Sequence, residues 1–256
     1  MKTARALQMA AVAVAAGALV LVPATAFAAG IAATASGSAS ATTGTGQSSD
    51  PVCSPSQFAT AQQKVETDLA NRVTRLNALL AQVQSPGSHL SSSDQAALVS
   101  DISGVELPGI QALQPEVQQA TTCAELWKYA HEMVYDYRVY VVMTPQTHET
   151  ITADDETYVD GQITSLEPTV EQAIAWAKAH GRDVSGADEA FTDLQNQCNA
   201  ASTAISGTSA TLLAQTPAGY PGNASVFVVA HTQETAARND LKAAYADLSQ
   251  IFRDLR

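Results

Sequence analysis

The amino-acid sequence predicts an all-α protein, an elongated antiparallel up-and-down bundle of five or six helices, and three observations lead there. The C-terminal segment carries a seam at alternating steps of three and four residues, typical of a helix that packs against other helices. Earlier segments show the same helical recurrence of apolar residues. Short connections rich in glycine and proline join the segments, as expected for antiparallel neighbours. The seam comprises Phe227, Ala230, Glu234, Ala237, Leu241, Ala244, Leu248, Ile251 and Leu255.

Six helical segments follow from this pattern. The expected helices run from Pro55 to Ser85, from Ser91 past Val117, from Thr122 to Pro145, from about Thr152 to His180, from Ser185 past Leu212, and from Asn223 to the C-terminal end. Pro108 predicts a kink in the second helix. Residues 135–143 alternate well enough to form a strand, but a lone strand has no partner in this sequence, so a helix is favoured.

Residues 1–28 have the features of a secretory signal peptide. Lys2 and Arg5 form a basic start, residues 10–22 form an apolar core, and Ala26-Phe27-Ala28 offers small residues for cleavage. The apolar run is shorter than the ~20 residues that span a bilayer. We therefore expect a secreted, extracytoplasmic bacterial protein with no permanent membrane anchor after signal cleavage.

The rest of the chain divides into two parts. Residues 29–51 are mostly Ala, Gly, Ser and Thr, a composition that predicts a disordered tether because it cannot bury enough apolar surface. Residues 52–256 have the length of one helical-bundle domain.

Charge excludes one class of partner. The formal net charge is −12 and only 15% of the residues are charged. Binding to a nucleic-acid backbone requires a concentrated basic face, and the sequence has none. Nucleic acid is therefore not an expected partner.

Three sequence phrases resemble a group of bacterial proteins. These are the loop at residues 216–223, the segment Asp136-Tyr137-Arg138-Val139-Tyr140-Val141-Val142, and Pro145-Gln146-Thr147-His148. They are similar to phrases in uncharacterised secreted all-helical proteins of high-GC Gram-positive bacteria, and the likeness covers most of residues 55–255. The resemblance implies the bundle and the export, and it carries no known activity.

Three cysteines permit one disulfide and leave one thiol. Cys53 precedes the first helix and Cys123 follows the second, so an up-and-down order places both at the same end of the bundle. Cys198 lies on an apolar stripe in the middle of a helix, far from that end. The sequence therefore predicts a Cys53–Cys123 disulfide, with Cys198 as a small core residue and a reactive thiol as the alternative.

Glu234 interrupts the apolar seam, so we expect its carboxyl to be at least partly buried and to have a partner. Arg72 and Arg75 lie on a helix expected to run opposite to the last one, at a similar height. The sequence favours an ion pair between Glu234 and these arginines that fixes the register of the seam. His231 and Glu234 share one helical face, which makes a metal site the alternative.

Residues 156–167 are similar to the second half of an EF-hand calcium loop. Asp160 would stand at position five, Gly161 at the sharp turn and Glu167 at the bidentate twelfth position. Tyr158 cannot supply the carboxylate of position three. Apolar residues also keep helical phase through the segment, so an ordinary helix is favoured over this degenerate calcium site.

Aromatic residues gather in one stretch of the chain. As part of the core they would supply large buried area, and as a binding surface they would stack on a sugar ring or a partner helix. The stretch contains Trp127, Tyr129, Tyr135, Tyr137 and Tyr140.

The sequence carries no enzyme signature, and we predict no catalytic residue and no cofactor. His131-Glu132 opens like a zinc-protease motif but Tyr135 replaces its second histidine. We expect a non-enzymatic helical bundle with a binding or structural role at the cell envelope, whose partner is an unknown envelope component or protein, and which is monomeric or weakly self-associating. The alternative is a metal-binding bundle, with or without hydrolytic activity, that uses His231 and Glu234.

Overall fold

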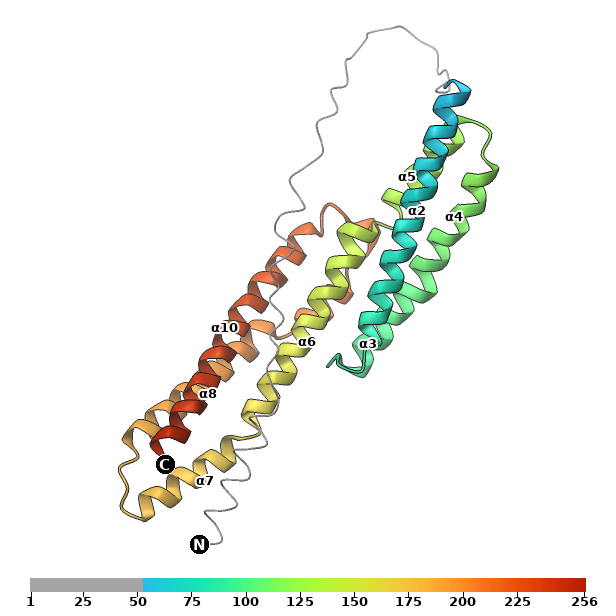
Figure 1. Cartoon of the computed structure of the whole chain (residues 1–256). Helices are drawn as coiled ribbons and strands as arrows, with labels where there is room; N and C mark the ends of the chain where they lie inside the picture. The colour runs from blue at the N-terminus through green and yellow to red at the C-terminus, as the bar shows by residue number, and fades with distance from the viewer. Residues whose placement is uncertain (1–52) are drawn as a thin grey trace. The chain divides into compact units, whose positions relative to one another are not determined.

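The computed structural model describes residues 53–256, and this part of the chain is helical with no strand (Figure 1). The all-α prediction is confirmed. The expected signal peptide and the whole of the expected tether lie outside the described residues. The elements are α2 (Pro55–Val83), α3 (Ser92–Val99), the π-helical η1 (Ser100–Glu106), α4 (Leu107–Gln119), α5 (Cys123–Tyr135), the π-helical η2 (Val139–Met143), α6 (Thr144–Thr164), α7 (Glu167–Ala179), α8 (Ser185–Ile205), α9 (Thr208–Leu213), the 3₁₀ turn η3 (Pro217–Gly219) and α10 (Ala224–Asp254).

Capping boxes fix two of the helix starts. The Ser54 hydroxyl accepts a hydrogen bond from the Gln57 N–H at 3.4 Å, and Pro55 occupies the first turn of α2. The Thr122 hydroxyl accepts from the Glu125 N–H at 3.2 Å, and the Glu125 carboxylate accepts from the Thr122 N–H at 3.0 Å. These contacts satisfy backbone N–H groups that have no partner within the helix.

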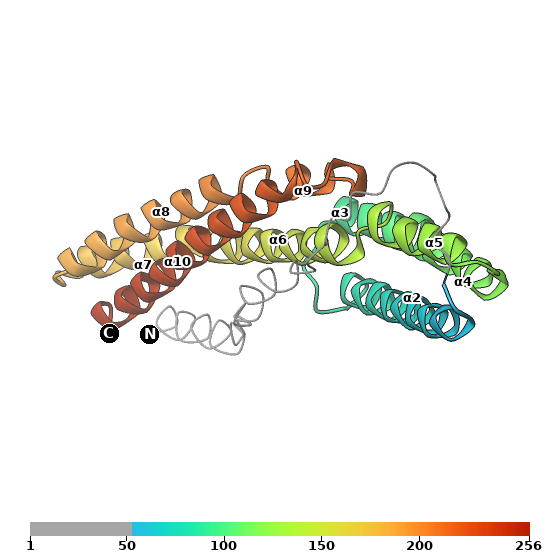
Figure 2. The same cartoon turned by 90° about the horizontal axis from the view of Figure 1, so that it is seen from above.

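Two apolar cores hold the helices together. In the first, α2, α3–α4 and α5 enclose fully buried residues such as Leu69, Leu76 and Ile110. In the second, α7, α8 and α10 pack with the C-terminal part of α6 around residues such as Leu194 and Leu241. Figures 1 and 2 both show α8 and α10 side by side. All seam positions of α10 from Phe227 to Ile251 are buried, as predicted.

The segment before α6 confirms the favoured helix over a strand at residues 139–143, and it corrects the expected helix end at Pro145 and the expected helix start near Thr152. Arg138 adopts a left-handed conformation (φ 45°), and the chain becomes helical again at Val139, so residues 139–143 form a π-helical turn and not a strand. Pro145 does not break the helix but lies in the first turn of α6, directly after the π-helical turn, which re-routes backbone hydrogen bonds next to a proline that cannot donate one. The helix expected to begin near Thr152 therefore begins at Thr144, eight residues earlier.

Helix α6 continues in the direction of α5, although these two segments were expected to be antiparallel. His231 contacts Glu149 and Arg238 contacts Glu156, so residue numbers rise together along α6 and α10 and the two helices are parallel. Arg75 of α2 contacts His148, and Ser91 contacts Asp154 further along α6, so α2 is parallel to α6 as well. The first and last helices, α2 and α10, consequently run in the same direction, whereas the sequence predicted that they run in opposite directions.

The predicted disulfide is confirmed. Cys53 and Cys123 are bonded across 70 residues, with Cα atoms 6.2 Å apart. Cys198 is buried in the second core, and burial raises the pKa of its thiol to about 11, which opposes thiolate chemistry. Among the helices between residues 53 and 256, none combines the length and the apolar character needed to cross a bilayer.

The kink expected at Pro108 is replaced by the π-helical segment η1, which joins α3 to α4 without a break. A π-helical turn re-routes backbone hydrogen bonds next to a proline that cannot donate one. Gly109 follows immediately, and a Cβ at this position would overlap the ring of Tyr137. Gly104, one and a half turns earlier, has no atom within 4 Å of an added Cβ.

We predict opposite effects of one substitution at these two glycines. Gly104→Ala should leave the free energy of unfolding unchanged or raise it by up to about 1 kcal/mol, because alanine restricts the unfolded chain. Gly109→Ala should lower it by about 1–3 kcal/mol, because Tyr137 must leave its position against the first core. Urea denaturation of both variants measures the difference, and equal effects would contradict the close contact.

Glu106, at the end of η1, gives a prediction for pH. Its side chain is 4% exposed and its Oε2 has no hydrogen-bond partner. Burial, with Asp101 nearby, raises the pKa of the Glu106 carboxyl to about 8. Between pH 4.5 and about pH 8 the folded chain therefore keeps a proton on Glu106 that the unfolded chain has released. The contribution of Glu106 to the free energy of unfolding consequently falls as the pH rises through this range.

We expect Glu106→Gln to be more stable than the parent at pH 8.5, by on the order of 2–4 kcal/mol, and nearly equal to it at pH 4.5. Denaturant unfolding at a series of pH values tests this. Glu66→Gln, at an exposed position of α2, serves as the control and should follow the parent. A Glu106→Gln profile parallel to that of the parent would show that this carboxyl does not carry the pH dependence.

Candidate functional site

Three rings lie next to one another along the outer face of α5. Trp127, His131 and Tyr135 are four residues apart, so they lie on one helical face. The ring centroids of Trp127 and His131 are 5.2 Å apart, and those of His131 and Tyr135 are 4.2 Å apart and nearly parallel. We call these three residues the aromatic row.

The amphipathic pattern of α5 directs the row outward. Leu126 and Met133 on the opposite face are 2% exposed and pack into the first core. Trp127 is 66% exposed and Tyr135 is 48% exposed. Contact with the ring of His131 holds both aromatic side chains in place without burying them.

Arg138 continues the row beyond the end of α5. Its guanidinium carbon lies 5.1 Å from the ring centroid of Tyr135 and 4.8 Å from that of Tyr220, a cation–π arrangement on both sides. Tyr220 belongs to the loop before α10. The arginine thus ties the C-terminal end of the row to that loop.

The five aromatic residues of this stretch divide between the two alternatives that the sequence leaves open, a part of the core and a binding surface. Tyr140 is 45% exposed, with the Arg72 guanidinium 5.1 Å from its ring centroid. Tyr129 and Tyr137 instead pack against the first core, and the Tyr129 hydroxyl donates to Glu116 Oε2 at 3.1 Å. His131 was not predicted to belong to this surface. Its position four residues from both Trp127 and Tyr135 indicates that it shares a helical face with them.

A second group of side chains lies where α6 meets α10. Glu149, His231 and Glu234 each offer one ligand atom, and these atoms lie within 4.8 Å of one another. His231 Nδ1 is 3.5 Å from Glu149 Oε2. We call these three residues the Glu/His cluster. Glu149 was not among the predicted residues, because its place opposite His231 depends on the parallel course of α6.

Glu234 is buried as predicted, but its neighbours differ from the expected ones. It is 1% exposed, and its Oε1 has no hydrogen-bond partner. Burial raises the pKa of Glu234 well above its ordinary value, and the carboxyls of Glu149 and Glu156 raise it further. Nearby, Arg238 Nη2 lies 3.0 Å from Glu156 Oε1, and burial raises the pKa of Glu156 to about 7 despite this arginine.

The expected ion pair of Glu234 with Arg72 and Arg75 is not found among the described residues. Arg72 donates to the Asp68 carbonyl at 3.0 Å, in addition to its contact with Tyr140. Arg75 donates to His148 at 2.8 Å and to Thr144 at 3.2 Å. The pairing assumed that α2 runs opposite to α10, and the missing reversal between α5 and α6 makes them parallel.

The segment considered as a calcium loop, residues 156–167, is helical except for a turn at residues 165–166. Helix α6 continues to Thr164, as the apolar phase predicted, and Asp160 and Glu167 do not meet in a group of three ligands among the described residues. Burial raises the pKa of Asp160, and Cys198 donates a hydrogen bond to it. Glu167 accepts a hydrogen bond from Gln195 at 3.0 Å. These residues therefore join α6 and α7 to α8.

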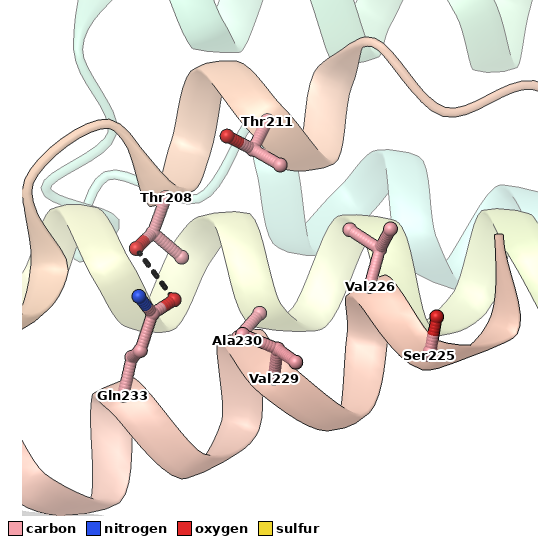
Figure 3. A pocket seen from close by; sticks show the side chains of 7 residues that line it. All are labelled: Thr208, Thr211, Ser225, Val226, Val229, Ala230 and Gln233. Carbon is pink, nitrogen blue, oxygen red and sulfur yellow. Dashed lines mark hydrogen bonds between the residues drawn. The ribbon is translucent and has the colours of Figure 1, made fainter.

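A small hollow lies between α9 and α10 (Figure 3). Its volume is about 180 Å³, and the Thr208 hydroxyl donates across it to Gln233 Oε1 at 3.4 Å. Ligand pockets usually measure about 300–1,000 Å³, so this hollow is too small to define a site for a larger ligand. It is lined by Thr208, Thr211, Ser225, Val226, Val229, Ala230 and Gln233.

No protein-family model matches the chain, and neither do the curated proteins or the solved structures with which it was compared.

The buried carboxyl of Glu234 gives a prediction about stability. In buffer containing EDTA, Glu234→Leu should raise the melting temperature or leave it unchanged, because leucine fills a similar volume without an unpartnered polar atom. Glu156→Leu should lower the free energy of unfolding by on the order of 2 kcal/mol, because it leaves Arg238, whose side chain is 19% exposed, without a counter-charge. Differential scanning calorimetry compares the two variants, and similar destabilisation by both would show that Glu234 has a stabilising partner.

Proposed function

We propose that this protein is a non-enzymatic, extracytoplasmic binding protein that holds a polysaccharide of the bacterial cell envelope on the aromatic row of α5. The observation that carries the proposal is the exposure of Trp127 and Tyr135, at 66% and 48%, with the ring of Tyr135 stacked on His131 and the ring of Trp127 tilted against it. Exposed aromatic groups of this kind mark interaction surfaces.

The row has properties suited to a sugar chain. Its rings are held before a ligand arrives, so little side-chain entropy is lost on binding. Lys128 and Glu132 flank the row on α5 and offer a donor and acceptors for sugar hydroxyls. Apolar ring surface beside hydrogen-bonding groups matches the mixed character of a sugar ring.

The disulfide at the N-terminal end of the domain and the signal-peptide features of the sequence support an extracytoplasmic location for this binding activity. Disulfides persist in oxidising compartments, and the chain contains the Cys53–Cys123 bond as well as the sequence features of a signal peptide. Cys123 lies one helical turn before Trp127, so the expected tether joins the domain next to the row.

The test is co-sedimentation of the full chain with insoluble cell-wall polysaccharide from a high-GC Gram-positive bacterium. The double variant Trp127→Ala, Tyr135→Ala should bind about tenfold more weakly or worse, because both stacking platforms are removed. Trp176→Ala is the matched control, since Trp176 is 43% exposed and stacks on His180 with centroids 4.0 Å apart, but lies on α7.

Three results would contradict the proposal. The parent chain would fail to sediment with the polysaccharide, or Trp176→Ala would lose as much binding as the double variant. Sedimentation velocity could also reveal a dimer that the double variant abolishes, which would make the row a contact between two copies of the chain.

A second candidate function is metal binding, which the Glu/His cluster favours. It uses different helices and different residues from the aromatic row, so the two functions can be tested separately.

A further inference from the structure

The Glu/His cluster contains a buried carboxyl oxygen that nothing in the described part of the chain satisfies. Glu234 is 1% exposed and its Oε1 has no hydrogen-bond partner, while Glu149 stands beside it with a side chain only 18% exposed. Two carboxyl groups in one poorly hydrated place cost free energy unless a proton or a cation accompanies them. His231, with a side chain 52% exposed, opens the cluster to solvent.

The same helix pair contains a second buried carboxyl, which differs from Glu234 in having a charged side chain in contact with it. Two helical turns further along both helices, the buried carboxyl of Glu156 meets the permanently charged guanidinium of Arg238 at 3.0 Å. At the equivalent position next to Glu149, the chain places His231, which carries no permanent charge. Glu156 thus has the cationic side chain of Arg238 beside it. Glu234 instead has the carboxylate of Glu149 and the imidazole of His231 as neighbours.

The distances suit a bound ion. Two ligand atoms that are each about 2.1 Å from one metal ion lie about 3.0–3.4 Å apart. The three ligand atoms of the cluster are within 4.8 Å of one another, and His231 Nδ1 is 3.5 Å from Glu149 Oε2. Small side-chain rotations therefore bring them around one ion without moving either helix.

We propose that Glu149, His231 and Glu234 bind one divalent transition-metal ion between α6 and α10, with zinc as the preferred metal. The ion offsets both carboxylates, and the neutral imidazole supplies the nitrogen ligand. Because the protein provides three ligands and the His231 side is open, water fills the remaining position.

The donor set selects the class of metal. Calcium takes six to eight oxygen ligands, which this cluster does not supply. One imidazole nitrogen and two carboxylate oxygens instead match zinc and neighbouring first-row divalent ions. Copper(I) is disfavoured because no thiolate or thioether belongs to the cluster.

Isothermal titration of the full chain with ZnCl₂, after removal of metals with EDTA and without a polyhistidine tag, tests the proposal. We expect one zinc ion per chain, with affinity at least tenfold weaker in His231→Ala and Glu234→Gln. Glu234→Gln keeps the volume of the buried side chain, and circular dichroism checks that it is folded. Titration with CaCl₂ should give at least tenfold weaker binding than ZnCl₂.

His180→Ala is the matched control, because His180 is an exposed histidine at the end of α7 that stacks on Trp176. It should bind zinc like the parent. Absence of stoichiometric zinc from the parent would overturn the proposal, as would retained affinity in His231→Ala or an equal loss in His180→Ala. Calcium binding as tight as zinc binding would overturn the assignment to transition metals.

Discussion

The left-handed conformation of Arg138 sets the direction of the second half of the chain. A residue at φ 45° interrupts the helix between Tyr135 and Val139, and the chain then continues in the same direction. The guanidinium of Arg138 contacts the rings of Tyr135 in α5 and of Tyr220 in the loop before α10, and these two contacts stabilise the turn. A non-glycine residue persists in this region of conformational space only when its surroundings over-determine it. Because α6 keeps the direction of α5, it runs parallel to both α2 and α10, and the Glu/His cluster follows from that order.

The first half of α6 is helical although it lacks an apolar stripe. Its buried face is polar, and neighbouring elements supply the hydrogen bonds: Gln146 donates to the carbonyls of Leu212 and Gln215 at 2.9 and 3.0 Å. Further along, Asp154 accepts from the Ser91 N–H at 2.8 Å and from the Ser209 hydroxyl at 2.7 Å. Burial of a polar group costs less when the group has a hydrogen-bond partner, so these contacts help to stabilise the polar face of α6, although Gln146 Oε1 and Thr150 Oγ1 on the same face have no hydrogen-bond partner among the described residues.

These features explain what the sequence could and could not predict. The α10 seam and the helix starts at Pro55 and Thr122 depend on local sequence signals, which are visible in one chain, and the structure confirms them. The start of α6 was missed because apolar periodicity is absent where the buried face is polar. The partners of Glu234 were missed for a different reason: they depend on the relative direction of distant helices, which a single turn at Arg138 decides. Residues within one helix were thus placed more reliably than contacts between helices.

The charged residues between α6 and α10 resolve an ambiguity that the apolar seam leaves open. A seam of alanine and leucine at three-four spacing repeats every seven residues, so a shift of one helix by seven positions would again place apolar residues against apolar residues. Such a shift would bring Arg238 beside Glu149 and place Tyr245 opposite Glu156. Glu156 would then be buried without a counter-charge, at a cost of roughly 3–5 kcal/mol. The Arg238–Glu156 contact therefore selects one register, and that register brings His231 and Glu234 to Glu149.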